Sequence, residues 1–118
     1  MPFLDLQSNL PACSFSEDFL KKFVSVTAAA LEKPEDRMHV VVHPGLPLMI
    51  KGSCAPGIIL SVSAIGATDS AEKNAKHSAK IFNFLTSELN LSEDRIGIIF
   101  NALQLHQVGK KGTVMSFL

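Results

Sequence analysis

The sequence predicts a single α/β domain, residues 1–118, built from two similar strand–helix–strand units. The length of 118 residues suits one domain. Strand-like apolar runs alternate along the chain with segments of helical periodicity. Two stretches 58 residues apart also resemble each other, which indicates an internal duplication over roughly residues 1–57 and 58–118.

The repeat is clearest where the second strand of each unit is expected. Residues 34–42, with the sequence PEDRMHVVV, resemble residues 92–100, with the sequence SEDRIGIIF. Subtracting 58 from the apolar run Ile58–Ile65 places that run on the N-terminal apolar segment Pro2–Leu6. Each unit is therefore expected to begin with a strand, continue through a helix and end with a second strand.

In the first unit, the strand Pro2–Leu6 leads through a turn into a helix. Ser14, with Glu17 three residues later, fits a capping box at the start of this helix. Pro34 should end the helix, because proline lacks the backbone donor that a helix interior needs. The valine-rich run Met38–Val42 predicts the second strand. The buried face of the helix is expected to comprise Phe19, Leu20, Phe23, Val24, Thr27, Ala28 and Leu31.

In the second unit, the near-continuous apolar run Ile58–Ile65 is typical of a strand that is covered on both faces. Thr68, Asp69 and Ser70 are candidate N-caps for the helix that follows. Arg95–Leu103 is expected to form the last main strand. The buried face of the second helix is expected to comprise Ser78, Ile81, Phe82, Leu85 and Leu89.

The two units together predict a four-stranded sheet with both helices on one face. A right-handed crossover makes the two strands of each unit parallel. The remaining segment, Val108–Leu118, is expected to form a turn and a terminal strand, and it is too short to cover the second face. Because 47% of the residues are hydrophobic, neighbouring subunits are the natural cover for that face.

Composition and charge exclude several classes of function. The 11 basic and 11 acidic residues balance and form no basic stripe, so no nucleic-acid partner is expected. No apolar run reaches the ~18 residues of a membrane span, and no signal-peptide pattern begins the chain. We therefore expect a cytoplasmic protein with no membrane partner, and export by an unconventional route is the alternative.

The sequence predicts no metal site and no cofactor. His39 and His43 share one strand face but lie ~13 Å apart, too far for one metal ion. The segment Gly109–Thr113 resembles a phosphate loop but lacks its spacing and the helix that follows it. Cys13 and Cys54 form no C-x-x-C pair and are expected to be reduced thiols.

Pro2 is the first candidate for chemistry. Aminopeptidase removal of Met1 would leave a free secondary amine, whose reference pKa of ~8 is closer to neutral than that of a lysine. The alternative is an ordinary start residue. Lys33 and Arg37 could together hold a substrate carboxylate, and the alternatives are a helix-end charge and a surface charge.

Several short motifs carry a resemblance that covers the whole chain. They are Met1–Phe3, Lys33–Pro34, Asp36–Arg37, Ser63–Gly66, His77–Ala79, Asp94–Ile96 and Gly112–Leu118. In combination they resemble the macrophage migration inhibitory factor family, and within it the dopachrome branch.

The resemblance implies a symmetric homotrimer with its sites at the subunit interfaces. It implies Pro2 as the catalytic base and Lys33, with Arg37 nearby, as the partner of a substrate carboxylate. It places Ala64 and Ile65 in the pocket. The implied reaction is the tautomerisation of D-dopachrome, with loss of carbon dioxide, to 5,6-dihydroxyindole.

Three positions depart from the family pattern. Ala64 stands where Ser is usual, Gly97 where the cytokine branch has Tyr, and Ile99 where the dopachrome branch has Arg. The resemblance therefore also leaves a second function class open, a secreted cytokine-like ligand of a cell-surface receptor, the MHC class II invariant chain. The intact Pro2 and Lys33 favour the enzyme, and the altered pocket rim keeps the ligand as the alternative.

Overall fold

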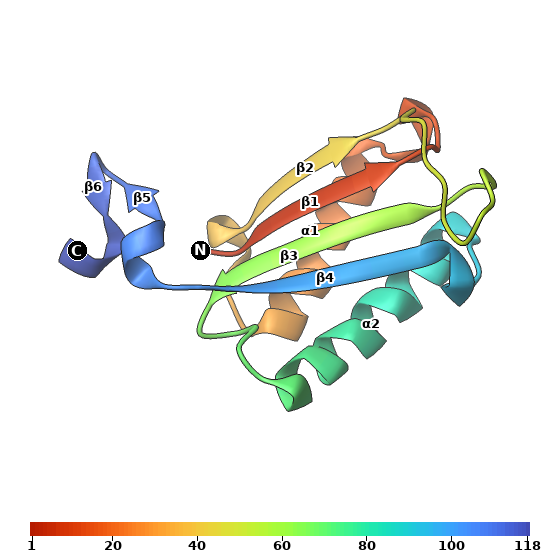
Figure 1. Cartoon of the computed structure of the whole chain (residues 1–118). Helices are drawn as coiled ribbons and strands as arrows, with labels where there is room; N and C mark the ends of the chain where they lie inside the picture. Colours follow the sequence, from red (N-terminus) through yellow and green to blue (C-terminus); the bar gives the residue numbers. More distant parts are fainter.

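The computed structural model describes all 118 residues and places four strands in one sheet. The strands are β1 (Phe3–Ser8), β2 (His39–His43), β3 (Ile58–Ile65) and β4 (Ile96–Leu103), and the helices are α1 (Glu17–Leu31) and α2 (Ala71–Leu89). Both helices lie on the same side of the sheet (Figure 1). The predicted α/β class, with a four-stranded sheet and two helices on one face, is confirmed.

The order of the strands in the sheet is β2-β1-β3-β4. Strand β1 is parallel to β2, and β3 is parallel to β4, as a helical crossover within each unit requires. The two central strands, β1 and β3, are antiparallel, so the sheet is mixed. In consequence the beginnings of β1 and β2 lie at the same end of the sheet as the last residues of β3 and β4.

The helix starts differ in part from the prediction. Ser16, and not Ser14, caps α1, and its Oγ accepts a hydrogen bond from the backbone N–H of Phe19 at 3.2 Å. The predicted capping box at Ser14 is wrong because Ala12–Ser14 form a short 3-10 turn that ends before the helix begins. Helix α2 is capped by Ser70, one of its three predicted candidates.

The ends of the helices fall 58 residues apart in the two halves of the chain. Helix α1 ends at Leu31 and α2 at Leu89, and each is followed by a residue in the left-handed conformation, Glu32 with φ 56° and Asn90 with φ 53°. Single 3-10 turns, Glu35–Arg37 and Glu93–Arg95, then precede β2 and β4. These turns explain why both strands begin one residue later than the sequence pattern predicts.

The core lies between the sheet and the helices. Alternate residues of β3 are fully buried toward the helices, while their neighbours are only half-buried on the other face. Strand β3 is therefore covered on one face within a single chain, although its apolar run is typical of cover on both. Phe84 of α2, which was not among the residues predicted for the buried face of that helix, also packs against the core, with its ring centroid 5.9 Å from that of Phe23.

The second face of the sheet, which we call the open face, has no cover from its own chain (Figure 1). Its apolar side chains Val41 and Ile99 are 52% and 55% exposed. The C-terminal segment forms a small ribbon, β5 (Gly109–Lys110) and β6 (Thr113–Val114), that lies beyond one end of the sheet. No helix is both long and apolar enough to cross a membrane.

Candidate functional site

The start of β1 is held firmly at one end of the sheet. Pro2 is almost completely buried. Its carbonyl oxygen accepts hydrogen bonds from the backbone N–H of His39 at 3.0 Å and from the His39 ring Nδ1 at 3.2 Å. The ring of Phe3 stacks on the same imidazole at 4.5 Å between centroids. The first residues of the chain are therefore part of the sheet and not a mobile tail.

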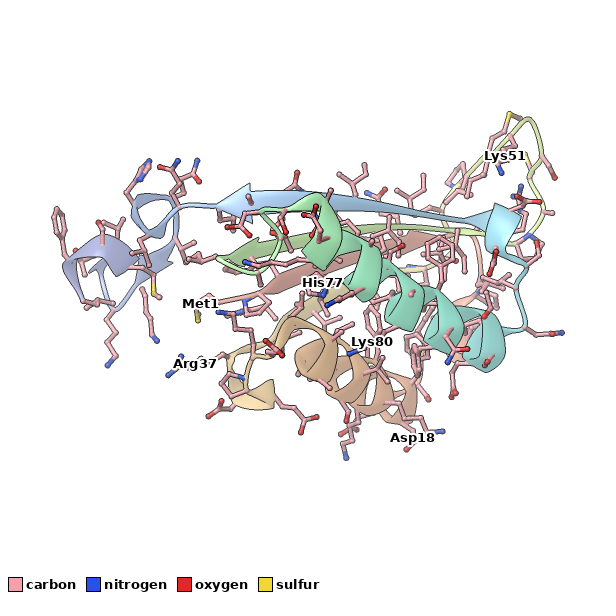
Figure 2. All side chains as sticks on the ribbon, turned by 90° about the horizontal axis from the view of Figure 1, so that it is seen from below. Met1, Asp18, Arg37, Lys51, His77 and Lys80 are labelled. Carbon is pink, nitrogen blue, oxygen red and sulfur yellow. The ribbon has the colours of Figure 1, made fainter.

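Three cations act on the amino terminus. In this chain the free amine belongs to Met1, one residue before Pro2, whose own nitrogen is an amide. Partial burial, and then the charges of Lys33, Arg37 and Lys110, lower the pKa of this amine below its ordinary value. Figure 2 shows Met1 and Arg37 together at this end of the molecule. The arrangement favours a neutral amine, the form that can accept a proton.

Arg37 and its counterpart 58 residues later have different surroundings. Arg95 donates hydrogen bonds to four backbone carbonyls of residues 50–56, at 2.6–3.1 Å, and so holds the loop before β3. The backbone N–H of Arg37 donates to the carbonyl of Pro34, but the side chains of Arg37 and Lys33 make no hydrogen bond or ion pair within the chain. Two cations at the candidate site thus remain free to receive an anion.

Ala64 and Ile65 lie at the end of β3, just beyond the pairing of Phe3 with Ser63. The side chain of Ala64 is fully buried toward the helices, and that of Ile65 is half-buried on the open face. The structure therefore brings Pro2 and Ile65 to one end of the sheet. Ala64 shares that end, with its side chain turned into the core.

Lys110 also lies near the amino terminus, and the sequence did not predict it as a residue of the candidate site. It lies in β5, within the segment interpreted as a turn. No spacing along the chain could have found it, because its position depends on where the C-terminal ribbon folds back. His39 was weighed only as a metal ligand, whereas its ring anchors Pro2. No group of three or more potential metal ligands gathers anywhere in the chain.

The two rim positions at which the chain departs from the family pattern both lie on the open face. Gly97 pairs with Ile59, and Ile99 pairs with Ser61 in the middle of the sheet. A Cβ atom added to Gly97 would meet no atom within 4 Å. Larger side chains at these two positions would therefore fit without a clash within the chain, and they would contact any subunit that covers the open face.

The chain is similar to known proteins along its whole length. The sequence profile of the family described as Macrophage migration inhibitory factor (MIF) matches residues 1–116. The D-dopachrome decarboxylases of Bos taurus and Xenopus tropicalis are 50% and 48% identical to the chain, over 100% of both proteins in each case. The solved macrophage migration inhibitory factor of Trichinella spiralis matches with a TM-score of 0.88 at 27% identity, covering 95% of this chain and 98% of that one.

Proposed function

Because the chain belongs to the macrophage migration inhibitory factor family, we propose that it converts D-dopachrome to 5,6-dihydroxyindole with loss of carbon dioxide. Relatives that share about half of its residues over the full length are named D-dopachrome decarboxylase. The single observation that carries the proposal is the start of β1, where Pro2 is buried and held by His39, and where burial and three cations lower the pKa of the adjoining Met1 amine.

The proposed base is the amine of Pro2 after removal of Met1. A neutral secondary amine at this position accepts the proton that leaves carbon in the tautomerisation. The proline ring holds the nitrogen rigidly, so little conformational freedom is lost when it is aligned with the substrate. The free side chains of Lys33 and Arg37 bind the carboxylate, which leaves as carbon dioxide.

The test is a direct assay with D-dopachrome. Protein whose Met1 removal has been verified by mass spectrometry should consume the substrate and release 5,6-dihydroxyindole and carbon dioxide in equal amounts. Heat-denatured protein is the control for the spontaneous reaction. Turnover that yields the indole without carbon dioxide would contradict decarboxylation, and the absence of turnover would remove the enzymatic proposal in favour of a ligand role.

We propose further that three copies of the chain associate through the open face and the C-terminal ribbon. Support comes from the exposed Val41 and Ile99 on the open face, and from Phe117, which is 81% exposed on the C-terminal segment. Apolar surface of this kind is typical of subunit interfaces. In a trimer the end of the sheet that carries Pro2 would gain a second wall from a neighbouring chain.

The oligomeric state can be measured directly. Light scattering on a sizing column should give about three times the 12.7 kDa mass of the chain. The mass should not change over a tenfold dilution in the micromolar range, because a trimer that the site depends on must have a dissociation constant below that range. A stable monomer would contradict the trimer, and with it the second wall of the site.

A further inference from the structure

A groove of about 320 Å³ lies between the C-terminal end of α1 and the N-terminal half of α2. Four lysines line it, Lys33 at the end of α1 and Lys73, Lys76 and Lys80 on α2, and Glu32 is its only carboxylate. Lys80 lies on the side of α2 that faces α1 (Figure 2). The groove therefore concentrates positive charge on a chain whose net charge is zero.

Most of these lysines have no partner within the chain. Only Lys73 is neutralised, with its Nζ 3.0 Å from the carboxylate of Asp69. The side chains of the other three groove lysines make no hydrogen bond or ion pair within the chain. In contrast, Lys21, Lys22 and Lys51 elsewhere in the chain each have a carboxylate oxygen within 3.6 Å. The charge of the groove is thus left unbalanced by the chain itself.

The spacing of the lysines indicates a ligand with more than one anionic group. Lys73, Lys76 and Lys80 lie three and four residues apart, so they share one side of α2. With a rise of 1.5 Å per residue, they extend over about 10 Å of the helix. Lys76 and Lys80 form an unfavourable pair of like charges, which an anion bound between them would relieve. A single phosphate could not reach all of these ammonium groups at once.

A buried histidine on the wall of the groove supplies an independent observation. His77 is only 7% exposed, and its ring Nε2 lies 2.6 Å from the carbonyl oxygen of Ala67. Because a carbonyl only accepts, Nε2 carries the proton and Nδ1 is left without a partner. One turn earlier, Oδ1 of Asn74 also has no donor. Buried polar atoms are rarely unsatisfied, so the unpaired Nδ1 of His77 indicates a missing hydrogen-bond donor next to the groove, which a small shift of the ring would expose to it.

We propose that the groove binds a small molecule that carries two or more linked phosphate groups. The volume suits a small ligand and not a folded partner. The free ammonium groups of Lys76 and Lys80 on α2 bind its phosphate groups, while Lys33 at the edge of the groove remains with the substrate site. The helices lie on the opposite side of the sheet from the open face, so the groove stays accessible in the proposed trimer.

Calorimetric titration of the intact protein tests the proposal without any turnover. The probes are inorganic triphosphate, ATP and inorganic phosphate, at low ionic strength where charge interactions are least screened. Triphosphate or ATP should bind at least tenfold more tightly than inorganic phosphate. The preferred probe then distinguishes a free polyphosphate from a phosphate ester. Equal affinity for all three probes would overturn the proposal, because it would mean that the second and third phosphate groups contact no lysine of the groove.

Two double variants locate the site. The variant K76Q/K80Q should weaken binding of the preferred probe at least tenfold, and its melting temperature should not fall, because both side chains lack partners and repel each other. The control variant K21Q/K111Q removes the same net charge elsewhere and should bind like the parent protein. Equal weakening in both variants would show a diffuse charge effect and would overturn the assignment to the groove, as would the absence of binding to the parent protein.

Discussion

A variant whose Pro2 nitrogen remains in an amide bond should lose D-dopachrome turnover by about 10²–10⁴-fold, the usual contribution of a general base. Inserting one alanine between Met1 and Pro2 produces this variant, because aminopeptidase action then stops at the new alanine. The fold should survive, since the structure already accommodates a residue before Pro2, where Met1 is half-buried. The amine is retained but moved by one residue, so the loss reports on its position.

The pH profile gives a second measurement on the unmodified enzyme. A base is active when it is neutral, so the rate should rise with pH through the pKa of the amine. Burial and the charges of Lys33, Arg37 and Lys110 lower the pKa of the Met1 amine, and we expect the same cations to act on the Pro2 amine once Met1 is removed, so the rise should fall below the ordinary α-amino value of ~8. Mass spectrometry must confirm the first residue of each sample. Full turnover in the alanine-inserted protein would eliminate Pro2 as the base.

Replacing Lys33 with methionine should lower kcat/KM for D-dopachrome by about one to two decades. A charge-assisted hydrogen bond contributes ~1.5–3 kcal/mol, and the Lys33 side chain has no partner within the chain that would compete for it. Lys33 is the first of the three cations that lower the pKa of the Met1 amine, so loss of its charge should also raise the pKa of the Pro2 amine that replaces it. The pH at which activity rises should therefore move upward.

Lys33→Arg is the matched control for this result. Arginine keeps the charge, so the pH at which activity rises should stay near that of the parent protein, even if KM changes with the different geometry. Full pH profiles of kcat/KM for both variants separate the effect of Lys33 on substrate binding from its effect on the pKa of the amine. A methionine variant with the parent KM and the parent pH profile would leave Lys33 only the role of a charge at the end of α1.

The elements of this fold could be predicted from the sequence because their signals are local. The i, i+3, i+4 pattern places α1, and Phe19, Phe23 and Leu31 from it are buried. The start of α1 was placed at Ser14 in error, because a 3-10 turn competes there for the same backbone groups. Such competition between local hydrogen-bonded structures cannot be settled by a capping pattern alone.

The candidate site was less accessible to sequence reasoning, since tertiary structure brings its members together. Lys33 and Arg37 are near Pro2 only because β1 pairs in parallel with β2, after the whole of α1. Family resemblance, not spacing, joined these three residues. Lys110 belongs to the same end through the fold of the C-terminal ribbon, which no periodicity or motif specifies.

The anchoring of Pro2 has a consequence for the timing of maturation. In the folded chain Pro2 is buried and His39 bonds its carbonyl, so the Met1–Pro2 bond adjoins a paired part of the central strand β1. His39 is 37 residues farther along the chain, so at 5–20 residues per second it is synthesised roughly 2–7 s after Pro2. We therefore expect Met1 to be removed most readily while the first residues of the chain are still unpaired. A chain in which β1 pairs first should be processed more slowly, so the fraction of retained Met1 in a preparation should depend on the rate of translation.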